Sequence, residues 1–297
     1  MYLYDPHRPP ATSIDLSHIN TPCHVFGFQG ESNLPTVLTG SDIVLIPAGI
    51  PRKPGMSRDD LFLSNARIAY QLATCCIKYL YSRFFMNRYC PEAIILIITN
   101  PINSILPLFN EVYKKNKIDG RTKLIGLSNL DSIRASTFVS QQLHSIPSFY
   151  TIPVIGGHAG TTIIPLFSQL DSQSLSQLDI PSLTHKIQFA GDEVVQAKAG
   201  QGSATLAMAY AAAHFTNSVL RAMNGEKNII EPAFIQQEVK GLHFFSSFVH
   251  LGMEGVENPI PIPSKLTKFE KDLLNNAIPV LKEQAQKGID FVDKEMT

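Results

Sequence analysis

The sequence predicts an α/β fold, in which a doubly wound parallel sheet is followed by an α+β region. Strand-like and helix-like segments alternate over roughly the first 145 residues, the order expected of a parallel sheet covered by helices. Residues 93–99 read AIILIIT, a continuous β-branched run that suits a strand buried on both faces. From residue 150 onward helical segments precede two paired strands, so the second half is organised differently.

The elements of the first half alternate in the order that a doubly wound sheet requires. The helix expected from Met56 has Ser57 as its N-cap and Asp59 and Asp60 in its first turn, where acidic side chains favour the helix dipole. The expected segments are strand Tyr2–Tyr4, helix Ser13–His18, strand His24–Phe28, strand Asp42–Pro47, helix Met56–Tyr81, strand Ala93–Thr99, helix Ser104–Lys115, strand Lys123–Leu127 and helix Leu130–His144.

The second half combines long helices with an antiparallel pair of strands. Small residues in Ser203–Met223 suit close packing against another helix, and Pro279 is expected to kink or break the last helix. The boundary between two domains, residues 1–128 and 129–297, is expected near Leu127–Asp131. The expected segments are strand Tyr150–Ile155, helices Leu183–Lys198 and Ser203–Met223, strands Ile230–Gln236 and Val239–Leu251, and helix Lys265–Glu295.

Composition is that of a globular protein without a polyanionic partner. The 297 residues include 25 basic and 25 acidic side chains, so net charge gives no reason to expect nucleic acid or an anionic membrane. No apolar run is long enough to span a bilayer. The four cysteines form neither a CxxC pair nor a metal-ligand spacing, so we predict reduced thiols and no metal.

A loop rich in proline and arginine follows the expected strand Asp42–Pro47. Residues 46–60, IPAGIPRKPGMSRDD, place two guanidiniums on one loop, at Arg52 and Arg58. A guanidinium matches a carboxylate bidentately, and ligands of open α/β sheets bind at the carboxyl edge of the strands. The loop is therefore a candidate anion site, and the alternative is a solvated basic loop.

Three further residues form a candidate site for an acid substrate. His158 follows an expected strand within GGHAG and is the best candidate acid/base; the alternative is a structural or surface histidine. Asp131 and Arg134 are three residues apart near a helix start and therefore share a face. A carboxylate beside an imidazole fixes its tautomer, and an arginine can hold a substrate carboxylate. Sequence alone does not place Asp131 against His158.

Five motifs together resemble the malate dehydrogenase family. IPAGIPRKPGMSRDDL, TNPINS, NLDSIRAS, VIGGHAGTTIIPL and AKAGQGSATLAMAYA occur in the family's order, and the resemblance is closest to the mitochondrial and bacterial type. It extends from about Leu3 to the C-terminus. The resemblance implies a Rossmann-like nucleotide-binding region, NAD as cofactor and the interconversion of malate and oxaloacetate.

The resemblance also implies roles for the charged residues. His158 would donate and accept the proton, and Asp131 would orient it. Arg134 would hold the substrate carboxylate next to the reacting carbon, and Arg58 would polarise the reacting carbonyl from a closing loop. Arg52 would hold the second carboxylate and so select malate and oxaloacetate over lactate and pyruvate.

Four residues would line the cofactor side by the same resemblance. Asn100 would lie near nicotinamide and substrate, and Met208 near the nicotinamide. Asp5 would bind the adenosine ribose, which favours NAD over NADP because its charge repels a 2′-phosphate. Gly49 would let the cofactor pass close to the backbone. By itself, Asp5 could also be a turn or capping residue before a proline.

The chain departs from the family pattern in three places. The family begins with a strand and a Gly-rich turn before the Asp-bearing strand, so we expect roughly 25 residues of that unit to be missing and the NAD-binding domain to be incomplete. The absent strand is central in the sheet order, so the strands on either side would lose their partner or close the gap differently. Residues 77–88 look like an insert of about ten residues, and Gln201 replaces a usually small residue.

Two hypotheses follow for function. The first is an NAD-dependent malate dehydrogenase, present as an isoform or an incomplete gene product. The alternative is a truncated isoform or paralogue that dimerises without turning over. The family further implies a homodimer, with Ser203–Met223 and Ser13–His18 as interface candidates. It also implies the mitochondrial matrix as location, with the cytoplasm as the alternative because the N-terminus does not read as a transit peptide.

Overall fold

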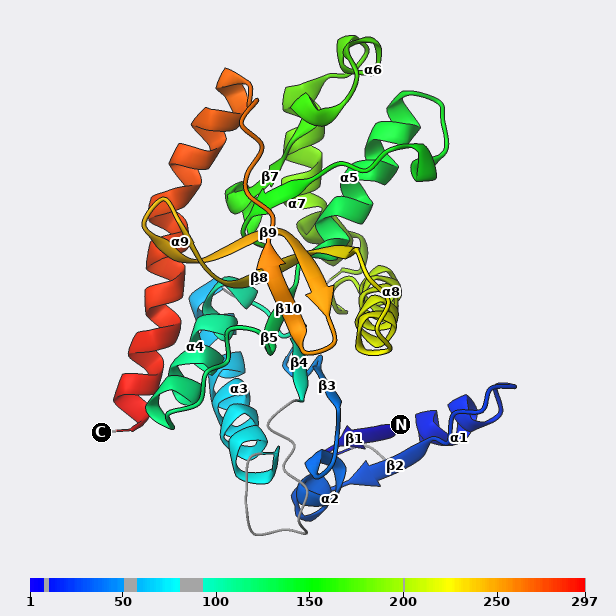
Figure 1. Cartoon of the computed structure of the whole chain (residues 1–297), viewed down its shortest axis with the longest axis vertical. Coiled ribbons are helices and arrows are strands. Elements are labelled where there is room, and N and C mark those ends of the chain that lie inside the picture. Colours follow the sequence, from blue (N-terminus) through cyan, green and yellow to red (C-terminus); the bar gives the residue numbers. More distant parts are fainter. Residues whose placement is uncertain (8–10, 51–57, 81–92, 200, 297) are drawn as a thin grey trace. The chain divides into compact units, whose positions relative to one another are not determined.

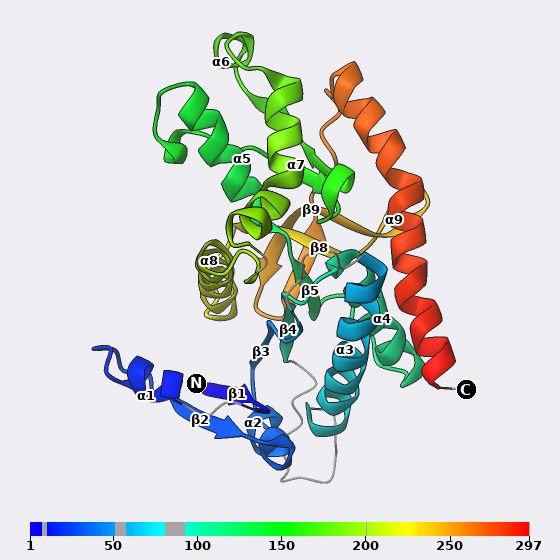
Figure 2. The same cartoon turned by 180° about the vertical axis from the view of Figure 1, so that it is seen from behind.

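The computed structural model describes residues 1–7, 11–50, 58–80, 93–199 and 201–296. The chain divides into two compact units, one formed by Met1–Val44 with Gln71–Ala93 and the other by Leu45–Tyr70 with Ile94–Thr297. Figures 1 and 2 show the elements of both units from opposite sides.

The strands mostly follow the predicted segments of the sequence. Their bounds are β1 (Tyr2–Asp5), β2 (Phe26–Gln29), β3 (Ile43–Ile46), β4 (Ile94–Ile97), β5 (Leu124–Leu127), β6 (Val154–Gly156), β7 (Ile163–Pro165), β8 (Ile229–Val239), β9 (Leu242–Gly252) and β10 (Gly255–Pro259).

The helices include several short turns that sequence patterns did not predict. The α-helices are α1 (Ala11–Ser17), α2 (Leu34–Leu38), α3 (Arg58–Leu80), α4 (Ile102–Lys115), α5 (Asn129–Gln142), α6 (Ser172–Ser176), α7 (Ile180–Ala197), α8 (Leu206–Met223) and α9 (Lys268–Glu295). The 3-10 helices are η1 (Glu31–Asn33), η2 (Pro147–Phe149), η3 (Gly160–Thr162) and η4 (Phe167–Gln169).

The larger unit is built on an eight-stranded sheet in the order β3-β4-β5-β8-β9-β6-β7, with β10 paired to β9. β4 and β5 pair in parallel, and β8 and β9 form a long antiparallel hairpin. Lys240 and Gly241 at its turn both have positive φ, as a two-residue hairpin loop requires. Figures 1 and 2 show α4 and α9 side by side along one side of the sheet, with α5 and α8 on the other. The mixed α/β fold class predicted from the sequence is confirmed.

The smaller unit contains a two-stranded parallel sheet. β1 and β2 pair over their full length, from Tyr2 opposite Phe26 to Asp5 opposite Gln29. In the described part of the chain, β1 and β3 belong to different sheets.

Strands β4 and β5 of the larger unit are buried along their whole length, which agrees with the β-branched runs in their sequences.

The structure corrects three details of the expected elements. The strand expected at Tyr150–Ile155 begins only at Val154, directly after Pro153, which has no N–H to donate to a neighbouring strand. Val239 ends β8 instead of starting β9. Pro279 does not break α9, since the flanking Ala277 and Leu281 are buried and packing holds the helix together.

Several expectations fall partly or wholly on residues outside the described part of the chain. Ser57, the expected N-cap of α3, is one of them. Of the expected insert at 77–88, only 77–80 are described, and they continue α3. Among the helices that are described, none is both long and apolar enough to cross a membrane.

Candidate active site

The carboxyl ends of β4 and β5 lead directly to the candidate site residues. β4 ends at Ile97, three residues before Asn100, and β5 ends at Leu127, four residues before Asp131. Ligands of open α/β sheets bind at this edge of parallel strands. The buried strands therefore present both residues on one well-supported edge.

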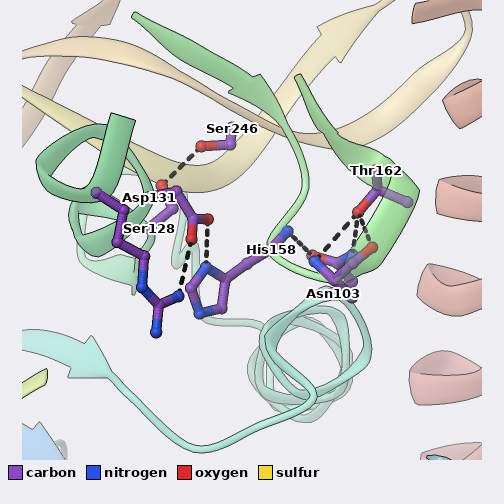
Figure 3. A network of polar contacts seen from close by, with 8 residues as sticks. Asn103, Ser128, Asp131, His158, Thr162 and Ser246 are labelled. Atoms are coloured by element: carbon purple, nitrogen blue, oxygen red, sulfur yellow. Dashed lines mark hydrogen bonds and ion pairs between the residues drawn. The ribbon is translucent and has the colours of Figure 1, made fainter. Parts of the chain in front are cut away.

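Asp131 and His158 form the central contact of the site. The Oδ2 atom of Asp131 lies 2.6 Å from Nδ1 of His158. Figure 3 shows the two side chains facing each other. The Asp131 side chain is fully buried and the His158 side chain is 11% exposed. A carboxylate accepts at this distance, so Nδ1 carries the proton and Nε2 is the nitrogen that can exchange one with a ligand. The structure thus supplies the contact that sequence reasoning could not.

Arg134 completes a charged cluster around the buried carboxylate. Its Nη1 lies 3.6 Å from Oδ1 of Asp131 across one helical turn, the spacing that the sequence predicted for a shared face. Oδ1 has no hydrogen-bond partner among the described residues, so the guanidinium is the group that compensates its charge. An unpaired charge in the interior is costly, and the nearby cation offsets that cost. The remaining guanidinium N–H groups can bind an anion.

The start of α5 fixes the position of Asp131. Asp131 lies in the first turn, where a carboxylate is favoured by the helix dipole, and its N–H donates to the Ser128 carbonyl at 3.1 Å. The hydroxyls of Ser128 and Ser246 lie 2.6 Å apart in the interior. This contact connects the start of α5 to β9, whose Ser246 also pairs with Gly156 of β6. The elements that carry Asp131 and His158 therefore meet at one serine.

Glycines give the backbone its path before His158. Gly156 has a φ of 102°, and a Cβ there would lie 2.2 Å from the carbonyl oxygen of Thr162. A side chain would therefore collide with backbone and strain the left-handed conformation. The GGHAG motif is explained by this close approach between β6 and the turn after His158.

A second cluster joins the loops after β3 and β4. The Asn65 side chain of α3 accepts from Ile50 N–H at 2.8 Å and donates to the Asn100 carbonyl at 2.7 Å. Gly49 has a φ of 147°, and a Cβ there would lie 2.9 Å from Oδ1 of Asn65. Asn65 is buried and was missed by sequence reasoning, which had no signal for a polar residue on the inner face of a helix.

The remaining predicted residues lie in different parts of the chain, and not all of them are described. Asp5 belongs to the smaller unit, where its carboxylate accepts from His7 N–H at 2.8 Å. Met208 lies on α8 and is half-buried. Arg52 lies outside the described residues. Arg58 begins α3, and its side chain is not described. Over the described ranges, no three His, Cys, Asp or Glu side chains gather as metal ligands would.

The geometry supports one kind of chemistry. A histidine with one nitrogen held by a buried carboxylate can pass a proton at the other, and the carboxylate stabilises the charged ring. A guanidinium within the same cluster can bind an acid group beside the reacting atom. The arrangement suits proton transfer to and from an oxygen of an anionic substrate.

Comparisons with known proteins agree with this chemistry. The lactate/malate dehydrogenase NAD binding domain matches residues 1–126, and the alpha/beta C-terminal domain of the same family matches residues 128–292. Mitochondrial malate dehydrogenase of Rattus norvegicus is 46% identical over 291 residues, 98% of this chain and 83% of the relative.

Two solved structures are similar over nearly the whole chain. Malate dehydrogenase from Cryptosporidium parvum is 28% identical, with a TM-score of 0.78 over 99% of this chain and 90% of that one. Lactate dehydrogenase of the same organism, complexed with lactic acid and β-nicotinamide adenine dinucleotide, is 26% identical, with a TM-score of 0.79 over 97% of this chain and 89% of that one.

Proposed function

The chain belongs to the lactate/malate dehydrogenase family, and we propose that it interconverts malate and oxaloacetate with NAD as cofactor. The observation that carries the proposal is the buried Asp131 carboxylate, 2.6 Å from Nδ1 of His158 and 3.6 Å from Nη1 of Arg134. The relatives that are about 46% identical are malate dehydrogenases, which favours a dicarboxylate substrate.

In the proposed reaction His158 moves the proton. Nε2 gives a proton to the C2 oxygen of oxaloacetate, and in the reverse direction takes it from the malate hydroxyl. Asp131 keeps the imidazole oriented and balances its charge when both nitrogens are protonated. Arg134 binds the carboxylate next to C2 through the N–H groups that do not face Asp131. The cofactor, when bound, would supply the hydride for C2 as NADH in the reduction of oxaloacetate and accept it as NAD⁺ in the oxidation of malate.

Arg52 and Arg58 are proposed to complete the substrate site. Arg58 would polarise the C2 carbonyl, and Arg52 would bind the distal carboxylate and select for a dicarboxylate. Family resemblance supports both roles. Arg52→Gln tests the selector: activity on oxaloacetate should fall far more than activity on pyruvate. Equal loss on the two substrates would reject Arg52 as the selector.

Gly49, Asn100, Asp5 and Met208 are proposed to bind NAD. Family resemblance supports the role of Gly49, and Asn100 is exposed at the carboxyl edge of the parallel strands. Asp5 at the end of β1 would accept from the ribose hydroxyls. The nucleotide-binding and catalytic domains are proposed to be residues 1–128 and 129–297, a division supported by the two family matches.

One pair of assays tests the proposal on this chain. We expect NADH binding by fluorescence titration and oxaloacetate-dependent loss of NADH absorbance. A chain with a folded circular-dichroism spectrum that neither binds nor oxidises NADH would refute the enzyme proposal. That result would favour the alternative of a non-enzymatic dimerising protein.

A homodimer is proposed through α8. Leu206 is 87% exposed, Tyr210 63% and Leu220 47%, an apolar surface that a second copy would cover. Sedimentation should give a dimer, and Tyr210→Lys should shift it toward monomer; a monomeric wild-type chain would contradict the proposal. A mitochondrial location is supported by the names of the relatives, and microscopy of a tagged full-length gene product would test it.

A further inference from the structure

We propose that Asn103 is a positioning residue that holds the backbone of His158 in place, with Thr162 and Gln284 holding Asn103 in turn. The inference rests on the proposed function, in which His158 moves the proton. Asn103 lies in the first turn of α4 and is 1% exposed. None of the family roles described above involves it.

Asn103 makes a hydrogen bond with each end of its amide. Its Oδ1 accepts from the His158 backbone N–H at 2.9 Å. Its Nδ2 donates to Oε1 of Gln284 at 2.8 Å and to Oγ1 of Thr162 at 3.3 Å. Because a backbone N–H can only donate, Oδ1 must face His158, and Nδ2 must face the two oxygens. The amide therefore has a single orientation.

Thr162 holds the backbone of Ala159, the residue that follows His158. Its hydroxyl donates to the Ala159 carbonyl at 2.8 Å and accepts from the Ala159 N–H at 3.2 Å. With the bond from Asn103 it uses one donor and two acceptor positions, the full capacity of a hydroxyl. Figure 3 shows Asn103 and Thr162 together beside the backbone of His158. Side chains thus fix the backbone at both His158 and Ala159.

Gly157 leaves the space in which Asn103 sits. A Cβ at Gly157 would lie 2.6 Å from Nδ2 of Asn103, 2.6 Å from Cδ2 of Leu281 and 2.7 Å from Oγ1 of Thr162. All three distances are shorter than carbon makes with such atoms. The second glycine of GGHAG therefore admits the amide that holds the following histidine.

Helix α9 supports the Asn103 amide through Gln284. Gln284 lies on α9, and one turn later a Cβ at Gly288 would lie 2.0 Å from the carbonyl oxygen of Ser104. This close approach seats α9 on the first turn of α4, next to Asn103. A residue 181 positions further along the chain thus stabilises the residue that orients His158.

The position of the backbone matters because the imidazole has to meet both Asp131 and the substrate oxygen. A displacement of about 1 Å at a reacting group can cost up to about 100-fold in rate. Without Asn103, the His158 N–H would be left without its partner, and the turn from Gly157 to Ala159 would lose one of the two side chains that hold it. Asn103 touches no reacting atom and acts through His158.

The test compares Asn103→Ala with Gln188→Ala. Gln188 is also a buried amide, but it donates to the Ile163 carbonyl instead of the backbone at His158. We expect Asn103→Ala to lower kcat about 10- to 100-fold, with KM for oxaloacetate changed less than about threefold. With deuterated NADH the isotope effect on kcat should rise, since a misplaced acid slows the chemical step. Gln188→Ala should keep kcat and the isotope effect of the wild type.

Gln284→Ala provides a milder variant, because it removes support from Asn103 and leaves the bond to His158. It should fall between Asn103→Ala and the wild type in kcat. Thermal unfolding identifies any variant that loses activity by unfolding. Equal kcat values in Asn103→Ala, Gln284→Ala and Gln188→Ala would overturn the inference.

A measurement without turnover separates this inference from the proposed function. The imidazole Cε1–H signal of His158 in a histidine-labelled chain should shift or broaden in Asn103→Ala and remain unchanged in Gln188→Ala. If the wild type lacks malate dehydrogenase activity while this difference is present, the proposed function fails and the positioning role stands. If wild type is active and the signal is the same in both variants, the positioning role fails.

Discussion

Two pairs of parallel strands in this protein differ sharply in burial. All residues of β4 and β5 in the larger unit are buried, whereas none of the residues of β1 and β2 in the smaller unit is. The exposed pair keeps large apolar side chains at its surface, with Tyr2 47% and Phe26 53% exposed. Parallel strands are usually covered on both faces, so the smaller sheet has little packing to stabilise it.

The difference separates two tasks of the proposed enzyme. Asp131, which supports the proton carrier, follows the buried strand β5, and Asp5, the proposed ribose ligand, ends the exposed strand β1. Regions with few buried apolar contacts open locally at lower free energy. We therefore expect rigid positioning for the proton transfer and a more easily opened sheet on the cofactor side.

The strongest test of the rigid side is Asp131→Asn. An amide in place of the carboxylate cannot balance a charged imidazole, so turnover should fall about 10²- to 10⁴-fold. Steady-state kinetics with oxaloacetate measures the loss, and a thermal unfolding midpoint close to that of the wild type shows that the fold is kept. Unchanged turnover would remove Asp131 from the mechanism.

Paired core and surface truncations test the difference in burial directly. Leu96→Ala in β4 should lower the free energy of unfolding by about 2–5 kcal/mol, because it opens a cavity in a fully buried strand. Phe26→Ala in β2 should cost less than about 1 kcal/mol, because half of the side chain is already exposed. Chemical denaturation of both variants measures the two changes in the free energy of unfolding. Similar losses would mean that the two sheets are equally supported.

Cys76 marks a well-buried part of the smaller unit and predicts a pH effect. Burial, with a smaller contribution from Cys75, raises the pKa of the Cys76 thiol to about 12 from 9.0. The unfolded chain therefore ionises this thiol from pH about 9, and the folded chain does not, so the stabilisation is intact below that pH and is lost as pH rises toward 12.

At pH 10 the wild type should have lost about 1.4 kcal/mol of unfolding free energy relative to pH 8 through this thiol. Cys76→Ala should lack that part of the loss, whereas Cys23→Ala, an exposed thiol, should keep it. Urea denaturation at the two pH values measures it. If the wild type, Cys76→Ala and Cys23→Ala lost the same unfolding free energy between pH 8 and pH 10, the buried thiol would not be the cause.

The smallest effect is expected at Asp5. Asp5→Ser should weaken NADH binding by up to about tenfold, the cost of roughly one hydrogen bond to a ribose hydroxyl. It should also narrow the difference in affinity between NADH and NADPH. Fluorescence titration with both nucleotides gives the ratio. If both affinities stay unchanged, Asp5 is a turn residue that accepts from His7 and has no role in cofactor choice.

Sequence patterns predicted the parts of this structure that depend on local signals. The run AIILIIT predicted the position of β4, and the spacing of Asp131 and Arg134 predicted that they share a helix face, where the structure shows an ion pair. The meeting of Asp131 with His158 required the family resemblance, because no spacing rule connects residues 27 positions apart.

Asn65 and Asn103 were missed for a related reason. Each is a buried amide whose partners come from other elements, and one of those partners is Gln284. A lone polar residue in a helix sequence gives no sign of which face is buried. The strand expected at Tyr150–Ile155 was also placed too early, since the segment contains Pro153, which has no N–H to donate to a sheet.

The bond between Gln284 and Asn103 has a consequence for synthesis of the protein. A chain emerging from the ribosome contains both Asp131 and His158 long before α9 exists. Domains begin to fold during synthesis, so a partly made chain can form the sheet and bring the two residues near each other. The histidine acquires its final support only when the last helix docks. The full rate of proton transfer is therefore expected only after α9 has been made and has docked.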